Sequence, residues 1–168
     1  ENTPWLNAGL SPSDLKDSAA AVLLNLQSAA SLELVSASRN GADLIVDLRV
    51  KNNTGHKFPT AYPSRRAWLH VTVSDANNKI IFESGRFDSA GALTDSNGNR
   101  IDGEKIVLPH QKEIDSGDMV QVYEGIMKDE SGGPTHILLR ATGFAKDNRL
   151  LPAGYSMAHP NASKTNPI

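Results

Sequence analysis

The stretch DLIVDLRV, residues 43–50, decides the fold class, because its apolar and charged residues alternate with a period of two. Such alternation is typical of a β-strand with one buried face. The stretch RAWLHVTV (66–73) has the same pattern, with Leu69 expected in the core and Trp68 on the opposite, exposed face. The turn DANN (75–78) and the run KIIFES (79–84) complete a predicted hairpin.

Further strands are predicted at 32–38, 118–127 and 135–144. Many short strands separated by Gly, Asn and Asp turns predict a mostly β fold, an antiparallel β-sandwich of the immunoglobulin-like or jelly-roll-like kind. Val122, in the predicted strand 118–127, is expected in the core of this sandwich.

One helix is predicted before the strands. Ser11 is suited to be its N-cap, Pro12 its first residue and Asp14 the partner in a capping box. Apolar residues then recur with the helical period, at Leu15, Ala19, Val22, Leu23, Leu26 and Ala30. The expected organisation is an extended arm (1–10), a helix packing on the sheet (11–30), a β-sandwich domain (31–158) and a flexible tail (159–168).

Composition excludes several classes of protein. The 168 residues carry 17 Lys and Arg against 19 Asp and Glu, a net charge of −2, which lacks the basic excess of a nucleic-acid-binding domain. No apolar run approaches the ~20 residues of a membrane-spanning helix. The absence of cysteine excludes disulfides, thiolate metal sites and covalent haem attachment through CxxCH in this chain. The first residue, Glu1, is that expected of a processed or excised product.

No catalytic motif is present, and we predict that the chain is not an enzyme. The motifs GxSxG, GxGxxG, the Walker loop and HExxH are all missing. The segment DSNGNRIDGE (95–104) places Asp95, Asn97 and Asn99 at alternate positions, as a calcium loop does. Gly98 and Glu104 are out of place for such a loop, so the segment favours a polar hairpin tip over a calcium site.

Two of the five histidines are candidate metal ligands. His56 and His110 each lie in a loop beside proline, in TGHKFP and LPHQ, where a rigid backbone can hold an imidazole toward a metal or partner. His70 and His136 lie within predicted strands and are expected to be structural, and His159 lies in the tail.

The segment NNTGHKFPTAYPSRRAW (52–68) is the densest polar cluster of the chain. Its cations are candidates to bind an acidic group such as a haem propionate: Lys57, Arg65 and Arg66. Its aromatic residues are predicted to contact a partner: Phe58, Tyr62 and Trp68. The alternative is a structural corner in which the arginines neutralise acids such as Glu124 and Asp147. A second cluster, KDNRLLPAGY (146–155), is expected to face it.

The run TGHKFPTAYPSRRAWLHVTVSDANNKIIFESG (54–85) resembles a stretch of multihaem c-type cytochromes of metal-reducing and related bacteria. There it belongs to a β-rich region that follows the haem-binding part. The resemblance continues through 120–155 and includes 26–34, the end of the predicted helix. It implies a periplasmic or extracellular protein of electron transport. Because CxxCH is missing, the chain would be a C-terminal portion of a cytochrome or a haem-free relative that associates with one.

Two kinds of function are therefore expected. The first is a non-catalytic β module that packs against a haem-bearing chain or segment, with His56 or His110 as an axial ligand to a haem c held there. The alternative is an extracellular recognition module for carbohydrate, mineral or peptide, based on the sandwich class and the aromatic residues Trp5, Tyr62 and Trp68.

Overall fold

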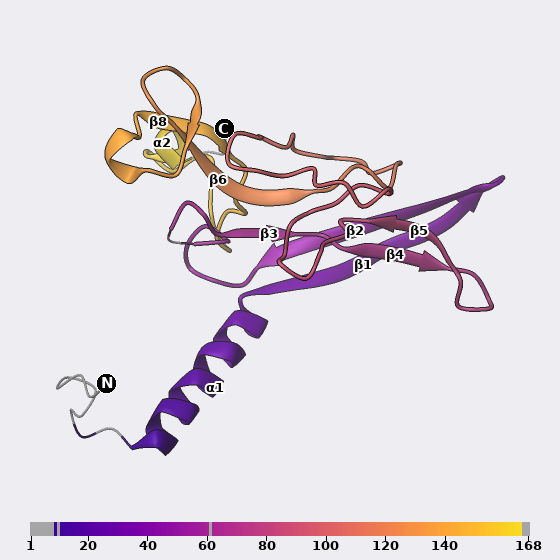
Figure 1. Cartoon of the computed structure of the whole chain (residues 1–168), viewed down its shortest axis with the longest axis horizontal. Coiled ribbons are helices and arrows are strands. Elements are labelled where there is room, and N and C mark those ends of the chain that lie inside the picture. The colour runs from indigo at the N-terminus through magenta and orange to yellow at the C-terminus, as the bar shows by residue number, and fades with distance from the viewer. Residues whose placement is uncertain (1–8, 10, 61, 166–168) are drawn as a thin grey trace. The chain divides into compact units, whose positions relative to one another are not determined.

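A computed structural model describes residues 9, 11–60 and 62–165 (Figure 1). The chain divides into two compact units, Glu1–Gly55 and His56–Ile168. The sequence predicts boundaries after residues 10, 30 and 158. The expected arm lies outside the described residues apart from Gly9, and so does Trp5.

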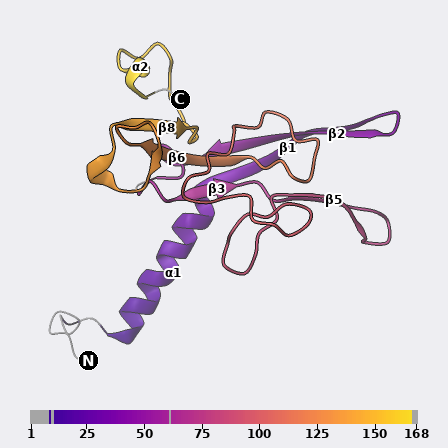
Figure 2. The same cartoon turned by 45° about the horizontal axis from the view of Figure 1, so that its top comes forward.

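The described residues of the first unit form one helix and one β-hairpin: α1 (Pro12–Ser28), β1 (Ala30–Asn40) and β2 (Asp43–Asn52) (Figure 2). The predicted helix start is confirmed, because the Ser11 hydroxyl accepts a hydrogen bond from the Asp14 amide while the Asp14 carboxylate accepts one from the Ser11 amide. This reciprocal pair satisfies two backbone donors that the first helical turn leaves unpaired.

The hairpin is amphipathic. Leu32 pairs with Val50 and Leu34 with Leu48 on one face, with a bulge after Leu34. On the other face, Glu33 forms ion pairs with two basic side chains of β2, Arg49 and Lys51. No apolar side chain among the described residues of this unit is buried. The packing of the helix on a sheet therefore stays a prediction.

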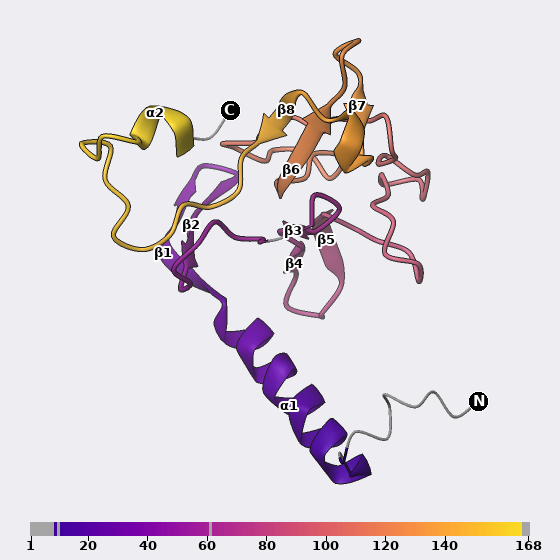
Figure 3. The ribbon, with the colours of Figure 1, turned by 90° about the vertical axis from the view of Figure 1, so that its left-hand side faces the viewer.

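The second unit contains the other strands, paired antiparallel (Figure 3). One sheet has β6 (Val122–Lys128) at its centre, with β3 (Arg66–Trp68), β7 (Pro134–Thr135) and β8 (Gly143–Asp147) paired to it. A separate pair is formed by β4 (Val71–Ser74) and β5 (Ile80–Ser84). The described part of this unit also has two short helices: the 3-10 helix η2 (Leu138–Arg140) and α2 (Ala162–Thr165). The prediction of a strand-rich, antiparallel chain with one long helix is confirmed.

Two predicted strands are interrupted. The segment 66–73 is split because its first half pairs with β6 and its second half with β5; between them, the Leu69 amide still donates to the Gln121 carbonyl at 3.1 Å. The segment 135–144 leaves the sheet after Thr135, whose hydroxyl accepts from the Ile137 amide. The chain then forms η2, where Leu139 is fully exposed, and returns to β6 as β8.

The core of this unit is centred on Leu93, Val120 and Val122, each at most 3% exposed. Val122 is a core residue as expected, and Leu69 is half-buried. The expectation that Trp68 is exposed is wrong. Trp68 packs against the core cluster and donates from Nε1 to the Gly85 carbonyl at 3.2 Å. Its ring meets Phe87 edge to face, so the strand face opposite Leu69 is covered as well.

The segment 95–104 begins with a tight turn, as favoured from its sequence. Thr94 and Arg100 form a β-bridge, and the Asp95 carboxylate accepts hydrogen bonds from the backbone amides of Asn97 and Asn99. Gly98 has φ +82°, the conformation that glycine adopts without steric cost. The Asp95 side chain therefore closes its own turn.

Neither α1 nor the shorter helices of the described chain have the length and apolar character that crossing a membrane requires.

Candidate functional site

From His56 onward, the two polar clusters singled out in the sequence lie side by side in the second unit. Phe58 and Leu150 form an antiparallel bridge, with reciprocal backbone hydrogen bonds of 2.9 and 2.8 Å. The bridge aligns the loop before β3 with the segment that follows β8. Charged side chains from both segments consequently meet at one corner of this unit.

Two of the three predicted anion-binding cations are used inside the fold. Lys57 Nζ lies 2.6 Å from Asp147 Oδ2, and this carboxylate also receives two hydrogen bonds from Arg149. Arg66 forms an ion pair with Asp102 and donates to the Gly91 carbonyl at 2.8 Å. Lys57 and Arg66 therefore neutralise acidic side chains of the chain itself, as in the alternative of a structural corner. The pairs differ from those expected of the two arginines. Arg66 is paired with Asp102, Asp147 is neutralised by Lys57 and Arg149, and Glu124 is paired with Lys146 at 2.7 Å.

The carboxylates of Asp147 and Asp102 are ionised although both side chains are buried. Desolvation is the largest influence on the pKa of Asp147 and opposes ionisation. The hydrogen bonds and the positive charges of Arg149 and Lys57 together outweigh it and hold this pKa below its ordinary value. Desolvation likewise opposes ionisation of Asp102, whereas the Leu93 amide and the two arginines around it lower its pKa. These ion pairs therefore have a structural role.

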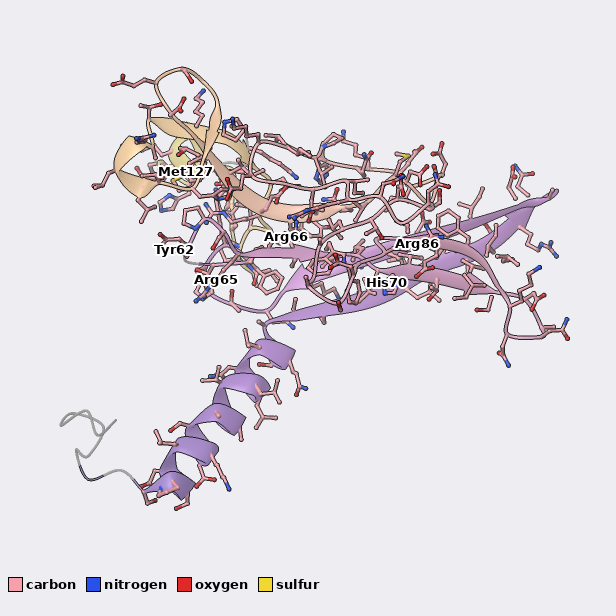
Figure 4. All side chains as sticks on the ribbon, in the orientation of Figure 1. Tyr62, Arg65, Arg66, His70, Arg86 and Met127 are labelled. Carbon is pink, nitrogen blue, oxygen red and sulfur yellow. The ribbon has the colours of Figure 1, made fainter. Side chains whose placement is uncertain are left out.

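Arg65 differs from its neighbours. Its side chain is exposed, and no hydrogen bond or ion pair joins it to another of the described residues. Together with Tyr62 (Figure 4) it lines a small cavity of about 60 Å³, whose other walls are Pro59, Pro63, Gly125, Phe144 and Arg149. Of the predicted anion-binding residues, Arg65 is the one that keeps this capacity.

Of the aromatic residues predicted to contact a partner, the structure leaves Tyr62 on the surface. It is 53% exposed. Phe58 is half-buried in its bridge with Leu150, and Trp68 belongs to the wall of the core. A continuous aromatic surface formed by these three residues is therefore not present.

The hydrogen bond of His56 to a backbone carbonyl sets the tautomer of its neutral ring. Its Nδ1 lies 3.1 Å from the Lys57 carbonyl oxygen, and because a carbonyl can only accept, Nδ1 carries the proton. The lone pair of the neutral ring is then on Nε2. A backbone carbonyl that orients the far nitrogen in this way is common behind metal-bound histidines.

His110 is held in the opposite tautomer. Its Nδ1 accepts from Gln121 Nε2 at 2.8 Å and from Asn148 Nδ2 at 3.0 Å. Backbone amides fix both donors, because Gln111 donates to the Gln121 side-chain oxygen and Glu124 to that of Asn148. The neutral ring of His110 consequently carries its proton on Nε2 and presents a donor there. Ligation through Nε2 would require this network to break, so we do not propose His110 as a ligand.

A larger cleft of about 260 Å³ lies beside the ion pair of Arg66 and Asp102. Glu124, His136 and Glu104 are among the residues that line it. Sequence reasoning missed this cleft, because its residues come from separate segments of the chain, spread from Pro63 to His136. Asp102 lies within the segment 95–104 that was considered as a calcium loop. No local sequence signal distinguishes its ion pair with Arg66 from the role of an ordinary turn residue.

Within the described residues, no three His, Asp or Glu side chains converge in a manner that could hold a metal ion. No protein-family model, curated protein or solved structure matches the chain.

Proposed function

We propose that the chain is a non-catalytic β module that packs against a haem-bearing chain or segment of a multihaem c-type cytochrome. In this proposal His56 is an axial ligand to a haem held by that partner. The strand-rich part is a sandwich of the immunoglobulin-like or jelly-roll-like kind, and the module works in the periplasm or outside the cell. In this proposal the haem would carry out electron transfer, while this chain would provide one axial ligand and shield the haem from water.

The observation that carries the proposal is the hydrogen bond from His56 Nδ1 to the Lys57 carbonyl. It orients the ring and leaves the lone pair on Nε2, the atom that would meet an iron. The neighbouring residues restrain the loop, because the Phe58 amide and carbonyl are both bonded to Leu150. Loss of the ion pair between Lys57 and Asp147 would loosen the same backbone.

The surface of the first unit supports a protein as the partner. On α1, Leu23, Leu24 and Leu26 are each more than half exposed, as are Leu32 and Leu34 on the hairpin. Large apolar side chains exposed in this number are typical of a region that another protein covers. The side chains of α1 project from all sides of the helix (Figure 4).

A titration of the chain with ferric protoporphyrin IX and imidazole tests the ligand role of His56. Imidazole fills the second axial position, so a chain that donates one histidine should give a low-spin spectrum at lower imidazole concentration than the haem alone. His56→Ala should remove this effect. His110→Ala is the matched control and should retain it, because that ring presents a donor at Nε2.

An identical low-spin spectrum for the wild-type chain and His56→Ala would exclude His56 as the ligand. A screen of soluble glycans and peptides addresses the recognition alternative, which a defined ligand that binds in the absence of haem would favour. A precursor gene that encodes CxxCH motifs together with this chain would support association with a cytochrome.

A further inference from the structure

We infer that the cavity between Arg65 and Arg149 is a binding site for a carboxylate. The inference stands on the geometry of the second unit and does not require a haem, so it can hold or fail independently of the role proposed for His56. Two sources share this chemistry, namely a haem propionate and the side chain of a Glu or Asp residue on a partner protein.

Arg149 is preorganised on one side of the cavity. Its Nε and Nη2 donate to the two oxygens of Asp147, at 2.7 and 2.9 Å, which leaves Nη1 without a partner among the described residues. The guanidinium lies over the Phe144 ring, 5.4 Å from its centre. Arg149 therefore presents a cation whose conformation is already fixed, which lowers the entropic cost of binding.

The close packing around Arg149 requires the glycine at position 125. A Cβ on Gly125 would lie 3.2 Å from Arg149 Nε and 3.4 Å from the Phe144 ring. The first contact is tighter than ordinary van der Waals packing and the second is at its limit. A larger residue at this position would therefore displace the guanidinium. This glycine lies in the centre of β6 and is one of the residues that line the cavity.

The charge around the cavity favours an anion. Lys57 and Arg149 share the single carboxylate of Asp147, and Arg65 adds a cation with no acidic partner in the described part of the chain. None of the described residues that line the cavity is acidic. Hydrogen bonding to Asp147 is the main reason that the pKa of Arg149 is raised, so the side chain keeps its charge.

The size and the walls of the cavity select a carboxylate among anions. A volume of about 60 Å³ admits one small group and not a whole cofactor. Two prolines and the Phe144 ring form flat apolar walls beside the cations, which suits a planar carboxylate carried on a short methylene stem. Guanidinium groups bind such a carboxylate through two parallel hydrogen bonds.

Binding can be measured on the full chain by NMR, with propionate as the probe and propionamide as its neutral counterpart. Saturable shifts are expected for the Nε–H signals of Arg65 and Arg149 and for the Gly125 amide with propionate alone. Arg65→Gln should weaken the affinity about tenfold or more, as expected for loss of a charged hydrogen bond. Arg39→Gln removes an exposed arginine of β1 and should leave the affinity unchanged.

Three results would overturn the inference: no saturable shift, equal affinity for propionamide, or unchanged affinity in Arg65→Gln. Sulfate that binds as tightly as propionate would contradict the selection of a carboxylate. The two sources are separated by comparing zinc protoporphyrin with its dimethyl ester, and a Glu-containing tripeptide with its Gln counterpart. Whichever acid shifts these signals while its neutral counterpart does not is the favoured source.

Discussion

At the scale of single residues, hydrogen-bond partners decide what each histidine and arginine can do. His56 and His110 both lie in a loop near a proline, yet the first donates from Nδ1 to a carbonyl and the second accepts at Nδ1 from two side-chain amides. Arg65 and Arg66 are adjacent in the chain, yet Arg66 is bound to Asp102 while Arg65 faces a cavity.

The network around His110 predicts a pH dependence of stability. Burial, followed by the positive charges of Lys146 and Lys112, holds the pKa of His110 below its ordinary value, and protonation would also cost the bonds from Gln121 and Asn148. In the unfolded chain the pKa of His110 is about 6.5. Between this pH and the lower folded pKa, the unfolded chain therefore binds a proton at His110 that the folded chain does not bind. Stability is therefore full above about pH 6.5 and falls as the pH decreases toward the lower folded pKa.

Urea unfolding at pH 7.5 and 5.5 measures this effect. The wild-type chain should lose more free energy of unfolding between these values than His110→Gln does. His136→Gln is the control and should keep the wild-type difference, because His136 is outside the network. Equal losses in the wild-type and His110→Gln chains would contradict the tautomer assigned to His110.

At the scale of elements, burial separates leucines that look alike in the sequence. Leu93 is completely buried against Val120 and Val122, while Leu139 in η2 is completely exposed. Leu93→Ala should cost about 2–5 kcal/mol through lost contacts and the cavity that remains. Leu139→Ala should change stability by less than about 0.5 kcal/mol. Thermal unfolding of both variants checks the assignment of the core, and similar losses would contradict it.

The junction between β3 and β4 depends on a close approach of two backbones. Gly85, at the end of β5, has φ +74°, and a Cβ there would overlap the carbonyl oxygen of Leu69. Gly132 has a similar φ of +84°, but nothing lies within 4 Å of its Cβ position. Gly132→Ala should cost about 1 kcal/mol through backbone strain alone, whereas Gly85→Ala should cost more than about 3 kcal/mol. Chemical denaturation of the pair isolates the clash, and equal costs would disprove it.

At the scale of the whole molecule, buried apolar side chains are unevenly distributed. All of those found among the described residues belong to His56–Ile168. A two-stranded hairpin is marginally stable without a covered face, and α1 has no buried residue. We therefore expect a fragment of residues 56–168 to unfold cooperatively in urea and a fragment of residues 1–55 to show no cooperative transition. Circular dichroism measures both, and an unfolded 56–168 fragment would refute the expectation.

The sequence by itself determined the features that depend on neighbouring residues. The capping box at Ser11, the hairpin strands around Gly41, and the turn at Asp95 are encoded within a few positions, because period and turn chemistry act locally. The absence of cysteine likewise excluded covalent haem and disulfides without any structure.

The tertiary structure alone decided the partners of charged and polar groups. Lys57 and Asp147 are 90 residues apart, and the tautomer of His110 depends on side chains from two other segments. The division of 66–73 between two strand partners and the packing of Trp68 against the core have the same origin. Desolvation and Coulomb energy depend on distance in space, so an alternating strand pattern cannot distinguish a cation that is neutralised inside the fold from one that remains available to a ligand.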